Sequence, residues 1–323
     1  MVKEVAIIAD SKGEGFYFAK GIYEYLRRKN KRKVSAELVD VERTDFRDGE
    51  FKVRISENIR RRMCFFVHDS NKEPCRWFTE LTFVLNAMAF SSPEEVNVVL
   101  PCMRFPRQDR KSESRVSVNA KALADVISMY ADRGMTVDLH APQIQMYFNV
   151  PFDNLYSFPI LIEHLERKHP EILENLVIVS PDPGGAKRAQ ALKNKLSDRD
   201  IKTGLAIGYK TREKDDEVDE TTIVGKVRGK NCLIVDDIID TGGTMIATGN
   251  ELKRIGARKV YAYGTHGLFT AGTEKFKYFD KVLVSNTLKR PENGNIEVVS
   301  LIGLFGEAVY RTVVGESLSS LFE

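Results

Sequence analysis

The strongest chemical signal in the chain is a run of acids, threonines and glycines behind an apolar stretch. Residues 232–235 are apolar, Asp236 and Asp237 follow, and then comes the run Asp240-Thr241-Gly242-Gly243-Thr244. Glycines ahead of a helix expose backbone N–H groups that bind phosphate, and the threonine hydroxyls add donors. The paired carboxylates accept hydrogen bonds from vicinal hydroxyls. The run therefore predicts a site for a ribose phosphate. The alternative, a glycine turn with an acidic helix cap, rarely carries three acids with T-G-G-T.

The elements that position this run form a regular pattern. Short apolar runs alternate with longer amphipathic stretches, which predicts βαβ units and a mostly parallel sheet. The pattern occurs twice, and the two α/β halves are expected to meet near residues 152–159. Expected strands are 5–9, 64–67, 96–100, 135–139, 176–180, 205–209, 232–236, 260–263 and 282–284, and expected helices are 16–28, 77–89, 118–131, 186–196, 244–255 and 303–314.

The acidic T-G-G-T run resembles the signature of the type I phosphoribosyltransferase fold, where it grips 5-phosphoribosyl 1-diphosphate. By itself it fits both a transferase that consumes this compound and the kinase that makes it. Further motifs separate the two, because they look like those of the ribose-phosphate diphosphokinases and stand in family order. They span about Phe46 to about Arg311 and comprise residues 46–50, 107–111, 137–141, 152–155, 179–189 and 265–269.

Two residues behind expected strands suit a divalent ion. His140 follows strand 135–139 and Asp182 follows strand 176–180. Ligands in open α/β sheets bind at the carboxyl ends of strands, and an imidazole with a carboxylate suits an ion that also takes ATP phosphate oxygens. The resemblance implies magnesium here. For His140 alone, a structural turn histidine is the simpler interpretation, and the other motifs reverse that preference.

Two further motifs suit a nucleotide. Arg107 is a bidentate phosphate donor and Gln108 offers an amide; the resemblance adds Asp109 to this ATP site. Phe46 can stack on adenine while Asp48 and Glu50 accept hydrogen bonds. The alternatives are a solvated basic helix start and an Asp-Gly turn between strands. In the family residues 46–50 serve a neighbouring subunit, so the resemblance implies a homo-oligomer built from dimers, with a hexamer among the expected sizes.

Lys210 and Arg212 open the most polar loop, 210–220. Phosphoryl transfer depends mainly on positioning and on neutralising the charge that develops. Two cations on a loop that closes over a nucleotide suit that task, and they match the family's catalytic K-x-R pair. Without the flanking motifs, two ordinary surface cations would be the better interpretation.

The composition excludes several other classes. The chain has 323 residues, more than one core of roughly 250–300 residues fills, and a net charge of +3, too small for a typical nucleic-acid binder. Its four cysteines show no C-x-x-C spacing. No apolar run is long enough for a membrane span, and no signal peptide is evident. We therefore expect a cytoplasmic protein with no nucleic-acid or membrane partner.

The sequence predicts two phosphoribosyltransferase-like α/β domains, each a mostly parallel sheet flanked by helices. Residues 1–153 are expected to make the ATP and subunit contacts, residues 154–304 to hold ribose 5-phosphate, and residues 305–323 to form a helix that packs back on the first domain. The predicted activity is transfer of the β,γ-diphosphate of ATP to C1 of ribose 5-phosphate. A phosphoribosyltransferase and a non-catalytic regulatory subunit remain the alternatives.

Overall fold

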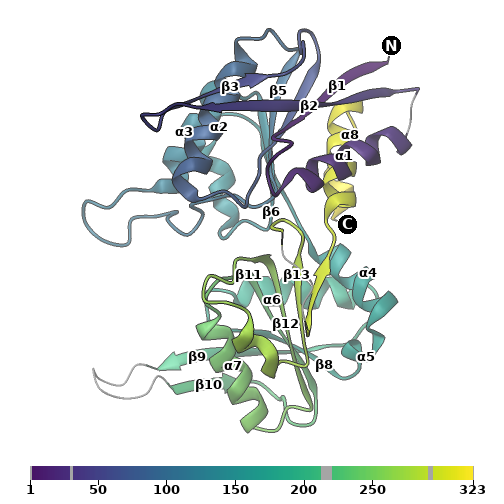
Figure 1. The fold of residues 1–323 in the computed structure, drawn as a ribbon. Helices are drawn as coiled ribbons and strands as arrows, with labels where there is room; N and C mark the ends of the chain where they lie inside the picture. Colours follow the sequence, from purple (N-terminus) through teal and green to yellow (C-terminus); the bar gives the residue numbers. More distant parts are fainter. Residues whose placement is uncertain (1, 30–31, 212–219, 290–293, 323) are drawn as a thin grey trace. The chain divides into compact units, whose positions relative to one another are not determined.

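The structure is a computed structural model of the 323-residue chain. It describes every residue except 1, 30–31, 212–219, 290–293 and 323 (Figure 1). The chain divides into two compact units. The first contains Met1–Tyr156, Thr287–Lys289 and Leu301–Glu323, and the second contains Ser157–Asn286 and Arg290–Ser300.

The first unit is built on a seven-stranded sheet with the order β3-β2-β1-β4-β5-β6-β7. All neighbours are parallel except β2 and β3. The strands are β1 (Lys3–Ala9), β2 (Val34–Asp45), β3 (Phe51–Ile55), β4 (Met63–Val67), β5 (Glu95–Leu100), β6 (Arg133–Val137) and β7 (Phe152–Leu155).

Helices cover both faces of this sheet (Figure 1). On one face lie α2 (Pro74–Ala89) and α3 (Asn119–Tyr130), whose Trp77 and Leu123 belong to a core with β1, β4 and β5. On the other face lie α1 (Phe16–Lys29) and α8 (Ile302–Val314), where the centroids of the Phe18 and Phe305 rings lie 5.2 Å apart. Short 3-10 helices complete the unit at η1 (Pro142–Tyr147) and η3 (Ser319–Leu321).

The second unit repeats the same plan. Its seven strands have the order β10-β9-β8-β11-β12-β13-β14, and only β9 and β10 are antiparallel. The strands are β8 (Leu176–Ser180), β9 (Gly204–Thr211), β10 (Glu220–Val224), β11 (Asn231–Ile239), β12 (Lys259–Gly267), β13 (Lys281–Ser285) and β14 (Ile296–Val299). The helices are α4 (Phe158–Lys168), α5 (Pro170–Leu173), α6 (Ala186–Ser197), α7 (Gly243–Arg254) and the 3-10 helix η2 (Glu274–Tyr278).

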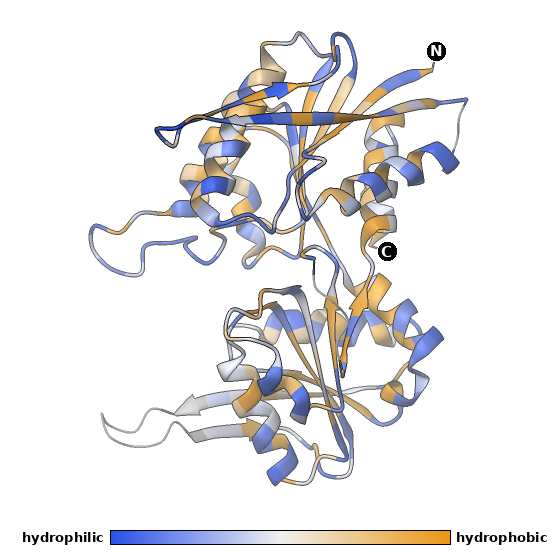
Figure 2. Ribbon diagram, viewed as in Figure 1, coloured by the Kyte–Doolittle hydropathy of each residue, from blue (hydrophilic) through white to orange (hydrophobic). Residues whose placement is uncertain are grey.

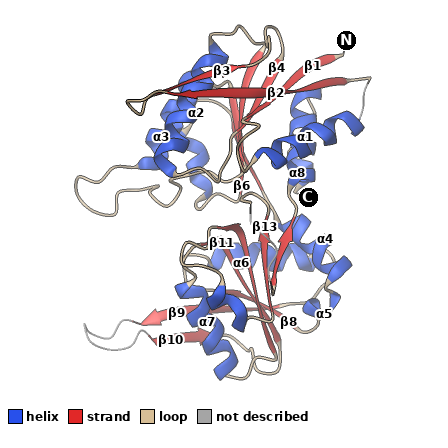
Figure 3. Ribbon diagram, in the orientation of Figure 1, coloured by secondary structure: helices blue, strands red, loops and turns tan. Residues whose placement is uncertain are grey.

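Hydrophobic patterning explains why both sheets are buried. The central strands are continuous apolar runs, as in Met63–Val67 and Leu176–Ser180, where every residue is buried; this is the pattern of parallel strands covered on both faces. Helices present apolar sides to the sheet and polar sides outward, as Figures 2 and 3 show together. The predicted fold class is confirmed. In the described part of the chain, no helix is long and apolar enough to cross a membrane.

The expected elements lacked α4, α5, β7, β10 and β14, and two further details bear on the site. The first is the expected end of the strand at 232–236, which was wrong because β11 continues through Asp236 and Asp237 to Ile239. The second is the stretch 34–55, where strands were expected only under the alternative of an Asp-Gly turn. It forms the β2–β3 hairpin, whose charged and apolar residues alternate in burial as expected for an edge of the sheet.

Candidate functional site

The acidic T-G-G-T run lies at the carboxyl end of β11 and at the start of α7. Asp236 and Asp237 are the sixth and seventh residues of the strand, and α7 begins at Gly243. In the parallel part of a sheet the carboxyl ends of strands form the usual ligand edge. The structure therefore brings the paired acids and the phosphate-type loop together within one short segment.

Arg188 is the partner that holds the two carboxylates. This α6 side chain places Nη1 3.1 Å from Oδ1 of Asp236 and 3.0 Å from Oδ1 of Asp237. Asp237 is almost fully buried, whereas the Asp236 side chain is 28% exposed and remains accessible to a ligand. Sequence reasoning did not select Arg188, because its partner Asp236 lies 48 residues away along the chain. The sequence feature that could have identified Arg188 was its place inside the motif 179–189.

Asp236 has an unusual acidity. Burial and the neighbouring Asp237 raise the pKa of the Asp236 carboxyl to about 8, although the Arg188 charge opposes the shift. A shift of this kind arises when a carboxylate loses solvent and faces a like charge. Asp236 is therefore able to change its protonation near neutral pH, which is a frequent property of functional sites.

The glycine before α7 is required by the geometry of the loop. Gly242 has φ +77, in the left-handed region, and a Cβ at this position would overlap the ring of Phe276. Gly243 by contrast has open space, since a Cβ there would lie 4.0 Å from its nearest neighbour, Oγ1 of Thr241. The chain thus turns sharply at Gly242 and leaves the face at Gly243 open for a ligand.

The first turn of α7 has backbone donors to offer. Among the described residues no side chain caps this helix, so the N–H groups of its first turn are not satisfied by a capping side chain. Thr241 is exposed and Thr244 is half-buried beside them. Asp240 accepts a hydrogen bond from the Thr270 hydroxyl, which links this loop to the segment after β12. Such a helix start is suited to a phosphate group.

A second loop of this unit contains Asp182. The loop follows β8, and its own backbone fixes the carboxylate, since Gly185 N–H donates to Oδ1 at 2.9 Å. The Ser180 hydroxyl donates to the Asp182 carbonyl at 2.6 Å. A carboxylate held at one oxygen in this way can offer its other oxygen to a ligand, which fits the donor set of a hard divalent cation.

The first unit contains His140, the other predicted metal ligand. It is exposed and lies three residues beyond the carboxyl end of β6. The preceding segment is held in place, because Leu139 N–H donates to Oδ1 of Asn154 at 3.0 Å and Asp138 has φ +44. His140 and Asp182 belong to different units and follow the strands β6 and β8, and β6 ends at Val137 instead of the expected residue 139.

Phe46, Asp48 and Glu50 form the exposed tip of the β2–β3 hairpin. The Phe46 residue is 48% exposed. Phe46 N–H donates to the Glu50 carbonyl at 2.8 Å, and Glu50 N–H donates to Oδ1 of Asp48 at 3.0 Å. Gly49 takes φ +92 to close the turn. The tip is the Asp-Gly turn anticipated as the alternative, and its exposed aromatic ring is available to a ligand or another subunit.

Arg107, Gln108 and Asp109 lie between β5 and α3. Arg107 and Gln108 are exposed, whereas Asp109 is buried. The Asp109 carbonyl accepts the Tyr147 hydroxyl, and the Gln108 carbonyl accepts Ala120 N–H at 3.1 Å. The segment is anchored through its backbone while Arg107 and Gln108 remain accessible to a ligand.

The structure describes only part of the predicted catalytic pair, Lys210 and Arg212. The Lys210 backbone lies in β9, paired with Thr221 of β10. Its side chain and all of Arg212 lie outside the described residues.

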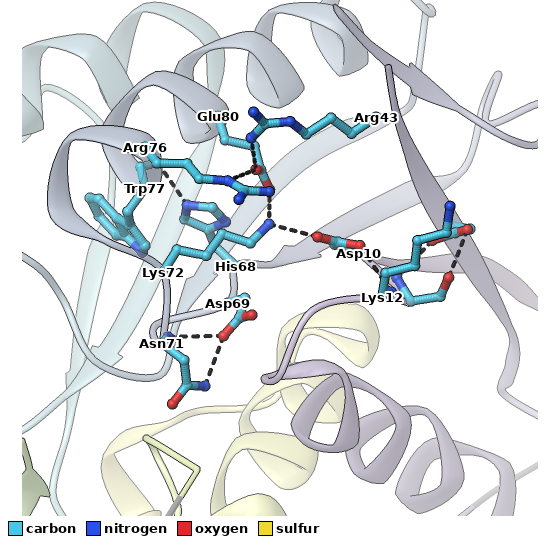
Figure 4. A network of polar contacts seen from close by, with 12 residues as sticks. Asp10, Lys12, Arg43, His68, Asp69, Asn71, Lys72, Arg76, Trp77 and Glu80 are labelled. Atoms are coloured by element: carbon cyan, nitrogen blue, oxygen red, sulfur yellow. Dashed lines mark hydrogen bonds and ion pairs between the residues drawn. The ribbon is translucent and has the colours of Figure 1, made fainter. Parts of the chain in front are cut away.

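The first unit has corresponding loops at the carboxyl ends of its strands. In these loops charged side chains of the protein contact one another (Figure 4). By strand order β1 corresponds to β8 and β4 to β11. Asp10 follows β1, and the Lys72 ammonium lies 2.8 Å from its Oδ2 while also contacting Glu80 of α2. Burial alone would raise the pKa of Asp10, but the Lys72 hydrogen bond holds it below its ordinary value.

A helix cap and a buried histidine satisfy further polar groups at this end of the first unit. The start of α2 is capped, because the Glu73 carboxylate accepts N–H bonds from Cys75 and Arg76, both at 3.0 Å. His68 is buried, and its Nε2 lies 2.9 Å from the Trp77 carbonyl oxygen, to which it donates. Burial lowers the pKa of His68 to about 3, so the ring is neutral. The helix start that is open in α7 is therefore occupied in α2 by the protein itself.

The two halves of the chain match the models of two different protein domains. The fold and the acidic loop define a protein of the phosphoribosyltransferase class, and residues 152–293 match the phosphoribosyl transferase domain model. Residues 16–130 match the model of the N-terminal domain of ribose phosphate pyrophosphokinase.

Whole-chain relatives agree with these domains. The ribose-phosphate pyrophosphokinases of Aquifex aeolicus and Chlorobaculum tepidum are each 39% identical, over 88% of this chain and 91% and 88% of theirs. The crystal structure of phosphoribosylpyrophosphate synthetase from Mycobacterium smegmatis matches with a TM-score of 0.84 at 27% identity, covering 97% of this chain and all of that one. This chain belongs to the ribose-phosphate pyrophosphokinase family.

Proposed function

We propose that this chain transfers the β,γ-diphosphate of ATP to the C1 hydroxyl of ribose 5-phosphate, giving 5-phosphoribosyl 1-diphosphate and AMP. The observation that carries the proposal is the pair of domain matches, in which residues 16–130 fit a domain named for pyrophosphokinases beside a phosphoribosyltransferase domain. A phosphoribosyltransferase would need the second domain alone. The reaction class is diphosphate transfer to an alcohol.

In this proposal the second unit binds the acceptor. Asp236 and Asp237 accept hydrogen bonds from the ribose hydroxyls, and Arg188 keeps both carboxylates in position. The 5-phosphate takes the backbone N–H groups and hydroxyls of residues 240–244, which the uncapped start of α7 leaves available. The C1 hydroxyl is then the free nucleophile, and it attacks the β-phosphorus in line as AMP leaves.

The donor is assigned to residues of the first unit. Arg107 and Gln108 are exposed and bind ATP, and Asp109 anchors their segment and contributes to the same site. Phe46, Asp48 and Glu50 contact the adenine of a neighbouring subunit, which requires a homo-oligomer built from dimers. Sedimentation of the purified chain tests this requirement, and an active monomer would contradict it.

His140 and Asp182 are the proposed magnesium ligands. Asp182 offers a carboxylate fixed by its own loop, and His140 offers an exposed imidazole. When bound, magnesium neutralises charge on the diphosphate. Lys210 and Arg212 are proposed to stabilise the charge that develops during transfer.

The test is AMP formation by purified protein with ATP, magnesium and ribose 5-phosphate, omitting each in turn. AMP that requires all three supports the proposal. The Lys210→Ala variant should lower kcat by orders of magnitude with its fold intact, because a transition-state contact acts on rate. Lys226→Ala, which changes an exposed lysine beyond β10, is the matched control and should keep normal turnover. Equal turnover in the two variants would refute the role of Lys210. No AMP at all would indicate a transferase or a non-catalytic subunit.

A further inference from the structure

The second unit contains a compact group of two histidines and one glutamate that the diphosphate transfer does not use. His164 lies on α4, His169 follows that helix, and Glu297 lies on the edge strand β14. Their three ligand atoms all lie within 4.8 Å of one another. His164 Nε2 is 2.8 Å from Oε1 of Glu297, and His169 Nε2 is 2.8 Å from Oε2. We propose that these three side chains bind a transition-metal ion of the Zn²⁺ type.

The donor set selects the class of ion. Two imidazoles and one carboxylate suit Zn²⁺, Co²⁺, Ni²⁺ or Cu²⁺, whereas Mg²⁺ prefers an all-oxygen shell. Donors around a tetrahedral zinc lie about 3.4 Å apart, since each bond is about 2.1 Å. The two nitrogen–oxygen distances of 2.8 Å therefore need to open by roughly half an ångström on binding. The magnesium of the reaction is not expected to compete.

A fourth residue supports the role of His169. Its Nδ1 lies 3.2 Å from Oε1 of Glu171, so a carboxylate faces each ring nitrogen. A neutral imidazole has one N–H and can satisfy only one of them. With a metal ion at Nε2, the Nδ1–H would donate to Glu171, which is the usual arrangement of metal-bound histidines.

Burial makes the cluster largely preformed. The exposed side-chain fractions are 7% for His164, 14% for His169 and 17% for Glu297. Side chains already held in place lose little conformational freedom on binding. The remaining exposure leaves a path for an ion and a water molecule to complete the coordination.

Two lysines share the carboxylate and oppose a cation. Lys281 Nζ lies 2.8 Å from Oε2 of Glu297, and Lys168 Nζ lies 3.4 Å from Oε1. Both contacts are with the carboxylate, and the lysine side chains are 28% and 49% exposed, so both can move into solvent. Their positive charge should weaken the site, which gives the proposal a directional test.

The experiment uses the full chain after removal of metals with a chelator. Titration with Co²⁺ in excess Mg²⁺ should give the visible absorption of a tetrahedral nitrogen–oxygen site at one ion per chain, and Zn²⁺ should displace it. Zn²⁺ should also raise Tm, because it binds only the folded chain. The Glu297→Gln and His169→Asn variants should lose the absorption and the rise in Tm, and circular dichroism checks that they fold.

Two further variants separate a metal site from an ion-pair cluster. Lys168→Met removes a competing charge and should tighten Co²⁺ binding several-fold, whereas Glu171→Gln should weaken it about 10–100-fold. Absence of stoichiometric Co²⁺ binding by the unmodified chain would overturn the proposal. So would unchanged binding in Glu297→Gln. Either result would leave the cluster as a set of histidines and lysines hydrogen-bonded to one carboxylate.

Discussion

The two units share a strand order and differ in what they do with the ends of their strands. In both, a strand from the middle of the sheet leads into a helix, β4 into α2 and β11 into α7. In the first unit the Glu73 carboxylate caps α2 and Lys72 joins Asp10 to Glu80 (Figure 4). In the second unit α7 starts after Gly242 with no side-chain cap among the described residues.

The difference shows how one architecture supports either packing or binding. An anionic ligand binds where backbone donors remain unsatisfied. The first unit supplies its own carboxylate and its own ammonium at that place, so its charges are satisfied internally. The second unit keeps its donors available and holds its paired acids with one arginine. We therefore propose that the ribose 5-phosphate site lies in the second unit alone.

The largest expected effect is on the stability of the first unit. Glu80 is 1% exposed and contacts Lys72, with Arg43 Nη1 at 3.4 Å. Removing one partner of a buried ion pair costs about 3–5 kcal/mol. Glu80→Gln should therefore lower the unfolding temperature strongly. Glu42→Gln is the matched control, since its pair with Arg54 is exposed and worth about 0–1 kcal/mol. Equal Tm values in the two variants would show that the network does not hold the unit together.

The next effect compares the two strand-end acids directly. Asp236→Asn should raise KM for ribose 5-phosphate about 10–100-fold, because each hydrogen bond to a charged group contributes about 1.5–3 kcal/mol. Asp10→Asn changes the strand-end acid of the first unit and should leave KM within a few-fold. Steady-state kinetics with saturating ATP, at a pH of about 9 where Asp236 is a carboxylate, measures both. A similar rise in KM in the two variants would show that the two strand-end acids do not differ in ligand binding.

A smaller effect is expected at the turn before α7. Gly242→Ala places a Cβ against Phe276 and forces a left-handed residue, which costs about 1–2 kcal/mol from the backbone alone. Gly243→Ala has open space within the protein and should leave the stability close to unchanged. Thermal unfolding of the two variants reports the effect. A neutral Gly242→Ala variant would mean that the turn is not held by its contact with Phe276.

The smallest effect is a pH dependence. The pKa of Asp236 is raised to about 8, so its carboxylate form, which accepts the ribose hydroxyls, grows as pH rises through that value. KM for ribose 5-phosphate should fall several-fold between about pH 7 and pH 9. In Asp236→Asn this dependence should vanish. A dependence that persists in Asp236→Asn would assign it to another group.

Local patterns predicted the parts of the fold that depend on neighbouring residues. Continuous apolar runs located the central strands, and the T-G-G-T run located the start of α7, because the chemistry of a turn lies within a few residues. The β2–β3 hairpin was anticipated only as an alternative, since its charged residues alternate with half-buried ones and resemble a loop.

Contacts between distant residues could not be predicted in the same way. Arg188 meets Asp236 across 48 residues, and His164 meets Glu297 across 133 residues. The Lys72–Asp10 contact spans 62 residues. Each depends on which strands become neighbours in the sheet, and this register is a property of the whole unit rather than of a local pattern.

The most direct measurement is the number of ribose 5-phosphate molecules that bind one chain, by isothermal titration calorimetry without ATP. We predict one molecule per chain in the unmodified protein and in Asp10→Asn. We also predict strongly weakened binding in the double variant Asp236→Asn/Thr244→Ala. Two molecules per chain, or undiminished affinity in the double variant, would contradict the proposal that only the second unit keeps a ribose 5-phosphate site.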